Sequence, residues 1–332
     1  MKVCIIGAGA IGGFIGTRLA LRGEHQVSAL ARGATLATLR QHGWRLRSGG
    51  ELLQAPCAGA SADALELGPQ DLVVIAVKGP ALAAVAAGIA PLLAPRTIVL
   101  PAMNGVPWWF CQGIAALGDE PLQSVDPGGK IAAAIPLRQV IGCVVHASTS
   151  QPEPGVVQHG RGQGLIVGEP AGGLSARVEA LAAALQQAGF DVTAAADVRQ
   201  DIWYKLWGNL TMNPISAITG ATIDRALADP LVRAFCSAAM LEASDVGERI
   251  GCPVAQSPED RHVITAKLGA FKSSMQQDAE AHRPIELDSI VTAVHEIGRR
   301  TGVATPNIDA LLGLTRLFGR AHGLYPEAAN RP

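Results

Sequence analysis

The first twelve residues constrain the fold of this chain more than any other segment. Residues 2–6, Lys-Val-Cys-Ile-Ile, are typical of a buried strand, and glycines follow them in the spacing G-x-G-x-x-G before an apolar helix. In a nucleotide-binding βαβ unit these glycines allow the tight turn, the approach of a pyrophosphate and close helix–strand packing. The N–H groups at the start of that helix then face the phosphates. A glycine turn without a ligand is the alternative. The predicted cofactor loop is Gly7, Gly9, Ala10, Ile11 and Gly12.

The residues that follow the second predicted strand, 26–31, distinguish between two cofactors. An NAD-binding unit usually has Asp or Glu there, where it bonds the ribose 2′-hydroxyl. This chain has Leu30, Ala31 and Arg32 instead. Because an arginine suits a 2′-phosphate, the sequence favours NADP(H) over NAD(H). A solvated surface arginine is the alternative reading of Arg32.

The first half of the chain alternates strands and helices. The apolar run at residues 71–77 is typical of a parallel strand buried on both faces. A further strand is expected at 97–100, and a helix at 175–188. Segments 140–146, 156–159 and 165–167 are expected to extend the same sheet. This alternation predicts an α/β fold, a Rossmann-type doubly wound sheet, over residues 1–196.

Beyond residue 197 the pattern changes, because apolar residues recur at helical spacing and no convincing strand remains. The sequence therefore predicts an all-α second domain over residues 197–332. A chain of 332 residues fits roughly two domains.

Composition excludes several classes of function. The formal net charge is −1, so nothing suggests a nucleic-acid partner. The six cysteines are scattered without metal-ligand spacing, so no metal site is expected. No run of eighteen apolar residues exists, and the chain starts directly with a strand. We therefore expect no membrane span and no leader, and a cytoplasmic protein.

Two polar residues follow predicted strands, at the sheet edge where ligands of open α/β folds bind. Lys78 comes after the strand at 71–77, and Asn104 comes after the strand at 97–100. Loop solvation for Lys78 and a turn at Asn104-Gly105 are the alternatives.

The start of the helical domain carries a second set of polar residues. Lys205, Asn209 and Asn213 are four residues apart, which places them on one helix face, while Trp203 and Trp207 are expected in the core. A lysine among amides is a candidate proton donor to a carbonyl, and its charge stabilises a developing alkoxide. An exposed lysine on an amphipathic helix is the alternative. Because a proline follows Asn213, the helix is expected to bend or end there.

A third set lies further along the chain. Pro284 suits the first turn of a helix. Glu286 and Asp288 in that turn would be stabilised by the positive end of the helix dipole. That role is the alternative to a functional one for Glu286. Ser273 and Ser274 could be surface hydroxyls.

Several separated motifs, in this order, resemble the ketopantoate reductase family over nearly the whole chain. They are G-A-G-A-I-G from Gly7, V-K-G at Lys78, M-N-G at Asn104, P-G-V-V-Q-H-G from Pro154, K-L-W-G-N and N-P from Lys205, S-S-M-Q-Q-D at Ser274, and R-P-I-E-L-D at Glu286.

The resemblance implies reduction of ketopantoate to pantoate with NADPH, for pantothenate and coenzyme A synthesis. It implies that Lys205 is the general acid and that Glu286 holds a substrate hydroxyl or orients the lysine. Asn209, Asn213 and Ser274 would bind the substrate carboxylate and hydroxyls. Arg32 would hold the 2′-phosphate, with Lys78 and Asn104 where cofactor and substrate meet.

One departure keeps the substrate open. Many relatives read E-I-D-x-I-N-G after the glutamate, whereas this chain has Val291 in place of the amide. The same chemistry on another branched 2-oxo acid is one alternative, and a redox sensor that binds NADP(H) without turnover is another. The set of Lys205, Asn209 and Glu286 argues against a sensor, which needs no proton donor. The sequence leaves the oligomeric state open, with a homodimer as one alternative.

Overall fold

The computed structural model describes residues 1–118 and 120–327, and its contacts divide the chain into two compact units. The first unit joins residues 1–103 to 130–201, and the second joins residues 104–129 to the remainder of the chain from Ile202. The boundary expected between residues 196 and 197 stays a prediction. The contacts add that the segment 104–129 packs with the second unit.

The first unit contains a parallel sheet in which each strand ends at the same edge. Ile6 pairs with both Leu30 and Ile75, and Ile75 pairs with Pro101, so four strands end at one level. The chain builds outward on both sides of the first strand, as a doubly wound sheet requires, which confirms the predicted fold class. In spatial order the strands are β5 (Gly59–Ser61), β2 (Gln26–Leu30), β1 (Lys2–Ile6), β6 (Gln70–Ile75) and β7 (Leu93–Pro101).

The expectation that the strands after residue 140 extend this sheet is wrong, because they form a second, mixed sheet. A hairpin at residues 44–55, which the sequence analysis missed, pairs with one of those strands instead. An isolated bridge pairs Val99, in the first sheet, with Val140, two residues before the second sheet begins at Gly142. The second sheet contains β3 (Trp44–Ser48), β4 (Glu51–Ala55), β8 (Gly142–Glu153), β9 (Val156–Gly168) and β10 (Asp191–Ala195).

Helix α1 (Ala10–Leu21) packs against both sheets, which explains why nearly all of its residues are apolar. A Cβ at Gly12 would lie 2.1 Å from the Gly7 carbonyl oxygen, on the side of β1. A Cβ at Gly16 would lie 2.7 Å from the Trp44 ring, on the side of β3. The third glycine of the fingerprint therefore permits close helix–strand packing, as the sequence analysis expects.

Cys4, at the centre of β1, is fully buried, and burial raises the pKa of its thiol to about 12. It therefore acts as a small apolar residue, as expected.

The remaining helical elements of the first unit are α2 (Gly33–His42), α3 (Ala64–Leu67), η1 (Gly79–Ala81), α4 (Leu82–Gly88), η2 (Ala90–Leu92), α5 (Lys130–Ala134), η5 (Leu137–Gln139) and α6 (Ala176–Gln187).

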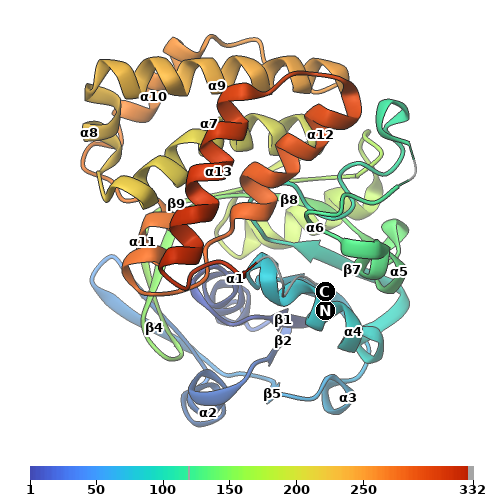
Figure 1. Cartoon of the computed structure of the whole chain (residues 1–332). Helices are drawn as coiled ribbons and strands as arrows, with labels where there is room; N and C mark the ends of the chain where they lie inside the picture. The colour runs from blue at the N-terminus through green and yellow to red at the C-terminus, as the bar shows by residue number, and fades with distance from the viewer. Residues whose placement is uncertain (119, 328–332) are drawn as a thin grey trace. The chain divides into compact units, whose positions relative to one another are not determined.

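The second unit has no strand among its described residues, which confirms the predicted all-α architecture. Its longest helices run from yellow to red in Figure 1, and α9 packs against α8, α10, α12 and α13. The elements are η3 (Ala115–Leu117), η4 (Pro127–Gly129), α7 (Val198–Thr219, which crosses the boundary between the units), α8 (Ile223–Ala228), α9 (Pro230–Arg249), α10 (Pro258–Ala266), α11 (Ser274–Glu280), the π-helical turn η6 (Asp288–Thr292), α12 (Ala293–Thr301) and α13 (Pro306–Ala321).

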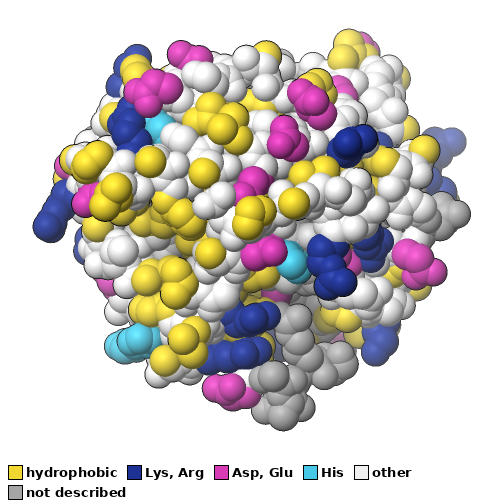
Figure 2. Space-filling model, turned by 45° about the horizontal axis from the view of Figure 1, so that its top comes forward, with side chains coloured by type: hydrophobic (Ala, Val, Ile, Leu, Met, Phe, Trp, Pro, Cys, Tyr) yellow, Lys and Arg dark blue, Asp and Glu magenta, His cyan; other side chains and the backbone are white. Residues whose placement is uncertain are grey.

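The described surface carries charges of both signs. Figure 2 shows lysine, arginine and acidic side chains interspersed on the face in view, in keeping with a net charge of −1. Within residues 1–118 and 120–327, no helix is long and apolar enough to cross a membrane.

Candidate active site

The glycine loop lies at the carboxyl edge of the parallel sheet. Gly7 adopts a φ of +87°, and its N–H donates to the Leu30 carbonyl oxygen over 3.3 Å. Gly9 is the N-cap of α1, and no atom lies within 4 Å of the position that a Cβ would occupy there. Open space beside a helix N-terminus suits the close approach of a phosphate. The residues present therefore fit the pyrophosphate of a dinucleotide.

Arg32 and Lys78 follow β2 and β6, the two strands that flank β1, at this same edge. Arg32 is the exposed N-cap of α2, and within the described ranges its guanidinium makes no hydrogen bond or ion pair. Lys78 is half-buried and is the N-cap of η1. A Cβ on Gly7 would lie 2.7 Å from Val77 Cγ1, so the turn that carries Lys78 is in direct contact with the glycine loop.

In the second unit, two anchored tryptophans of α7 flank Lys205. Trp203 is 1% exposed and stacks on Phe110 with ring centroids 6.0 Å apart. Trp207, also 1% exposed, donates its indole N–H to the Met240 carbonyl oxygen over 2.7 Å. Both are core residues, as expected. Because both neighbours are fixed, the backbone that carries Lys205 is held in one orientation.

The structure brings Lys205 and Asn104 together. Lys205 Nζ donates a hydrogen bond of 2.7 Å to Asn104 Oδ1, and both side chains are half-buried. An amide oxygen can accept a hydrogen bond from an ammonium but cannot take its proton, so this contact does not compete for the proton. The arrangement presents a held proton donor, which suits protonation of a carbonyl oxygen.

The Asn104 turn also packs against the residues that follow Glu286. Val106 N–H donates to the Ser289 carbonyl oxygen over 2.7 Å. Gly105 has a φ of +81°, and a Cβ there would lie 2.4 Å from that same oxygen. Asn104 is therefore fixed between α7 and the turn η6. Glu286 itself is half-buried, one residue before the first helical position at Leu287.

The expectation that Pro284 lies in the first turn of a helix is wrong. Pro284 is exposed and outside the helix, and the first helical turn carries Asp288 as its acid. Tyr325 Oη donates to Asp288 Oδ1 over 2.6 Å, so Asp288 is held by this contact. Asp288, rather than Glu286, is therefore the acid placed to interact with the positive end of the helix dipole.

The two asparagines of α7 continue the Lys205 face. The helix does not end at Asn213, because it continues to Thr219 with Pro214 inside. Asn209 is half-buried and Asn213 is 6% exposed. Neither side-chain amide makes a hydrogen bond to any residue that the structure describes. Asn209 is the more accessible of the two to a ligand.

The two serines before α11 differ in their surroundings. Ser273 is the buried N-cap, and its Oγ pairs with Ser216 Oγ at 2.6 Å. Ser274 is exposed at the first position of the helix. Of the two, only Ser274 is accessible to a substrate.

Sequence reasoning missed the pairing of Asn104 with Lys205. Asn104 was expected from the strand that precedes it, as a residue of the sheet edge. No local signal marks the segment after it as part of the helical unit, since its regular structure within the described residues is limited to two short 3₁₀ turns. The buried aromatic run at Trp108, Trp109 and Phe110 is the one feature that could have indicated a segment packed into a core.

Comparisons with known proteins agree with this geometry. Residues 3–172 match the family model described as ketopantoate reductase PanE/ApbA, and residues 197–318 match the model of its C-terminal part. The chain belongs to the ketopantoate reductase family. It is 43% identical, over 98% of its length and 100% of the relative, to the 2-dehydropantoate 2-reductase of Mesorhizobium japonicum. It is therefore an enzyme of an oxidoreductase family.

Solved structures support the same assignment. A candidate ketopantoate reductase from Ralstonia solanacearum MolK2 has a TM-score of 0.93 and 54% identity, covering 97% of this chain and 99% of that one. A D-mandelate dehydrogenase solved with NADH and anilino(oxo)acetate has a TM-score of 0.84 at 20% identity, covering 98% of this chain and 100% of that one. At that identity the likeness shows the fold alone.

Proposed function

We propose that this enzyme reduces ketopantoate to pantoate with NADPH, as a step in pantothenate and coenzyme A synthesis. The observation that carries the proposal is the hydrogen bond of 2.7 Å from Lys205 Nζ to Asn104 Oδ1, because it holds a charged proton donor at a defined place. When bound, the nicotinamide supplies the hydride that reduces the ketone carbon. The family membership supports 2-dehydropantoate as the substrate.

The chain's own residues would act on the substrate as follows. Lys205 donates a proton to the ketone oxygen, and its charge stabilises the alkoxide that forms there. An ammonium has three N–H donors, so Asn104 can hold the side chain by one while another points at the substrate. Glu286 holds a substrate hydroxyl or orients the lysine, and Asn209, Asn213 and Ser274 bind the carboxylate and hydroxyls.

The first unit would hold the cofactor. Gly7, Gly9, Ala10, Ile11 and Gly12 bind the pyrophosphate by backbone N–H groups, with Lys78 and Asn104 also in contact with the cofactor. Arg32 binds the 2′-phosphate, supported by its exposure and by the absence of an acid in the loop after β2. This is the reason for proposing NADP(H) rather than NAD(H). A cytoplasmic location and a homodimer stay predictions.

A second candidate is the same chemistry on another branched 2-oxo acid. Val291, where many relatives have an amide, is 0% exposed inside the turn η6, directly after Ser289 and Ile290. A buried apolar side chain there cannot supply an amide to a substrate hydroxyl. The residues of this chain therefore specify the type of reaction more narrowly than the identity of the substrate. A sensor without turnover is disfavoured by the Lys205–Asn104 pair.

One assay separates the three alternatives. NADPH oxidation is measured without a 2-oxo acid, with ketopantoate, and with 2-oxoisovalerate, which lacks the hydroxymethyl group. Ketopantoate should give the highest kcat/KM. A higher value for 2-oxoisovalerate would overturn the substrate, and tight NADPH binding without oxidation in any mixture would overturn the reaction.

A further inference from the structure

The segment 104–129, apart from residue 119, is attached to the helical unit at two places. The first is its beginning, where Asn104 accepts from Lys205 and Val106 donates to the Ser289 carbonyl oxygen. Between the two attachments, Trp109 and Phe110 are 0% exposed. Phe110 also stacks on Trp203 of α7, so the segment is packed along its middle and hydrogen-bonded near both ends.

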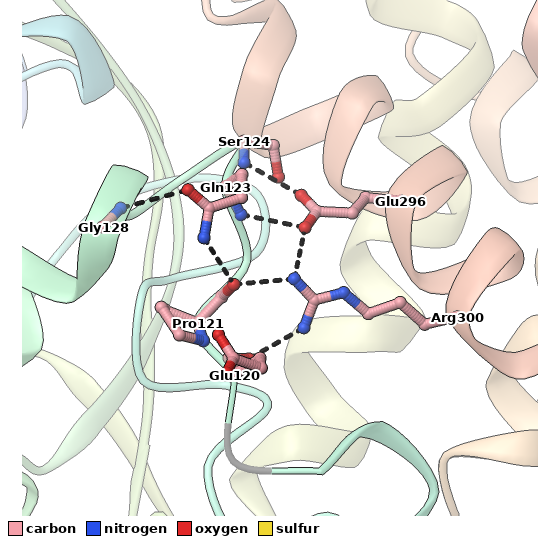
Figure 3. Close-up of polar contacts among 7 residues, drawn as sticks. All are labelled: Glu120, Pro121, Gln123, Ser124, Gly128, Glu296 and Arg300. Carbon is pink, nitrogen blue, oxygen red and sulfur yellow. Dashed lines mark hydrogen bonds and ion pairs between the residues drawn. The ribbon is translucent and has the colours of Figure 1, made fainter. Parts of the chain in front are cut away.

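The second attachment is a pair of side chains from α12, Glu296 and Arg300, which we call the Glu296–Arg300 clamp (Figure 3). Glu296 Oε1 accepts from Gln123 N–H and Glu296 Oε2 from Ser124 N–H, each over 2.9 Å. The carboxylate therefore binds two consecutive backbone amides, one with each oxygen. Hydrogen bonds of this charged kind are roughly twice as strong as neutral ones.

Arg300 completes the clamp from the other side. Its Nη1 donates to the Glu120 carbonyl oxygen over 2.8 Å, and its Nη2 donates to the Pro121 carbonyl oxygen over 2.7 Å. Nη2 also donates to Glu296 Oε1 over 2.6 Å. The side chains of Glu296 and Arg300 are 18% and 22% exposed, so water screens the set only partly. Figure 3 shows both side chains pointing from the helix toward the loop.

The Ser289 contact of the first attachment and the whole of the second come from one continuous helical stretch. The turn η6, with Ser289, runs directly into α12, with Glu296, so the two contacts are seven residues apart on the same rod. The Ser289 contact is made by its backbone carbonyl oxygen, and the Glu296 contact by its side chain. Glu286 immediately precedes this rod. The rod therefore holds the segment both beside Asn104 and at Gln123 and Ser124.

We propose that Glu296 is a positioning residue for the reaction: through Gln123 and Ser124 it holds the segment 104–129 against η6 and α12, and so keeps Asn104 in register with Lys205. The proposal rests on the proposed roles of Lys205 and Asn104. Glu296 touches neither of them and acts only through the segment that it binds.

The test uses Glu296→Gln, which keeps the shape of the side chain and replaces one of its two acceptor oxygens with an NH₂ group. Glu242→Gln is the matched control, because Glu242 also binds two consecutive backbone amides, those of Asn307 and Ile308, at the start of α13. Both variants are combined with Asn104→Ala, and kcat, KM and Tm are measured for the full chain. We expect Glu296→Gln to lower kcat about tenfold, within the roughly 10²-fold that a displacement of 1 Å can cost.

The variant that combines Glu296→Gln with Asn104→Ala distinguishes positioning of Asn104 from a general effect on stability. If Glu296 acts through Asn104, Glu296→Gln should lower kcat less than about twofold when Asn104→Ala is already present. Glu242→Gln should lower Tm to a similar extent and leave kcat unchanged. Equal kcat for Glu296→Gln and Glu242→Gln, or full additivity with Asn104→Ala, would overturn the proposal. An unmutated enzyme without ketopantoate-dependent NADPH oxidation would instead overturn the proposed function.

Discussion

The glycine loop of the first unit and the Lys205 face of the second are built in different ways. The loop comes from one local segment, and its properties are those of the backbone: a φ of +87° at Gly7, open space at Gly9 and close packing at Gly12. The Lys205 face is assembled from α7, the Asn104 turn and the rod that follows Glu286. Backbone N–H groups can bind the pyrophosphate that every dinucleotide shares. A particular reaction instead needs side chains with particular chemical groups.

This comparison predicts that substitutions in the two regions affect different quantities. Changes in the glycine loop should alter cofactor affinity or the free energy of unfolding, because they change available space. Changes in the Lys205 face should alter the rate, because they remove a chemical group that the backbone cannot replace.

The largest effect is expected for Lys205→Ala. If Lys205 is the general acid, kcat should fall about 10²–10⁴-fold, the usual contribution of a positioned acid, while NADPH affinity stays nearly unchanged. Lys205→Arg should not restore the rate, because a guanidinium is a poor proton donor and has a different shape. Steady-state kinetics and an NADPH titration check both expectations.

Lys267→Ala is the control, since Lys267 is an exposed lysine at the C-cap of α10. Its kcat should match that of the unmutated enzyme. Retention of more than about a tenth of the rate by Lys205→Ala would show that the proton comes from another group, and the difference between the two regions would lose its basis.

Much of this comparison could be predicted from the sequence, because the informative signals are local. The strand, three glycines and helix at the N-terminus define one supersecondary unit, and β1 and α1 form where expected. The hairpin β3–β4 was missed although Gly49-Gly50 between two short runs is a hairpin signal. Its pairing with β9, far along the chain, left no local trace.

The Lys205 face could be predicted only in part. Helical spacing correctly aligned Lys205, Asn209 and Asn213, because periodicity is a local property. The contact of Lys205 with Asn104 depends on a non-local packing of the segment 104–129, which contains little regular structure. Neither periodicity nor a turn signal reports such a contact.

The next largest effect concerns Arg32, the one side chain in the proposed cofactor site that would distinguish NADPH from NADH. A hydrogen-bonded charge pair with the 2′-phosphate is worth roughly 1.5–3 kcal/mol, or about 10–150-fold in affinity. Arg32→Ala should remove most of that preference and leave NADH binding little changed. Dissociation constants for both cofactors provide the measurement.

Arg22→Ala serves as the matched control. Arg22 is an exposed arginine at the other end of α1, paired with Glu24 at 3.3 Å. It should leave the preference intact. If the unmutated protein binds both cofactors equally, Arg32 is only a surface residue.

Two alanine substitutions within the glycine loop should separate folding from binding. At Gly12 a Cβ would lie 2.1 Å from the Gly7 carbonyl oxygen, so Gly12→Ala should lower the free energy of unfolding by about 1–3 kcal/mol. At Gly9 nothing lies within 4 Å, so Gly9→Ala should leave stability unchanged but weaken NADPH binding. Denaturant unfolding and a cofactor titration measure the pair. Unchanged NADPH affinity in Gly9→Ala would contradict the proposed approach of the pyrophosphate.

A smaller effect is expected for Glu286→Ala. If Glu286 binds the substrate or orients Lys205, kcat/KM should fall about tenfold, a loss of about 1.4 kcal/mol, with little change in Tm. If it only compensates a helix dipole, stability should fall by roughly 0.3–1 kcal/mol and the kinetics should hold. Glu259→Ala, in the first turn of α10, is the reference for the second outcome.

The smallest effect is a dependence of stability on pH. We expect it for Glu296, on the rod of the Lys205 face, and not for the glycine loop. Burial alone would raise the pKa of Glu296, but the hydrogen bonds from Ser124 and Gln123 and the charge of Arg300 outweigh it, so the pKa is lowered from its usual 4.5. A lowered carboxyl pKa contributes stability above the unfolded value and loses it as the pH falls through the folded value. The Tm difference between the unmutated enzyme and Glu296→Gln should therefore hold from about pH 7 to about pH 5 and shrink below the usual 4.5. The difference caused by Gly12→Ala should not change over the same range, because no titrating group is involved. A Glu296→Gln difference that stays constant, or widens, in acid would mean that the carboxylate charge does not hold the segment.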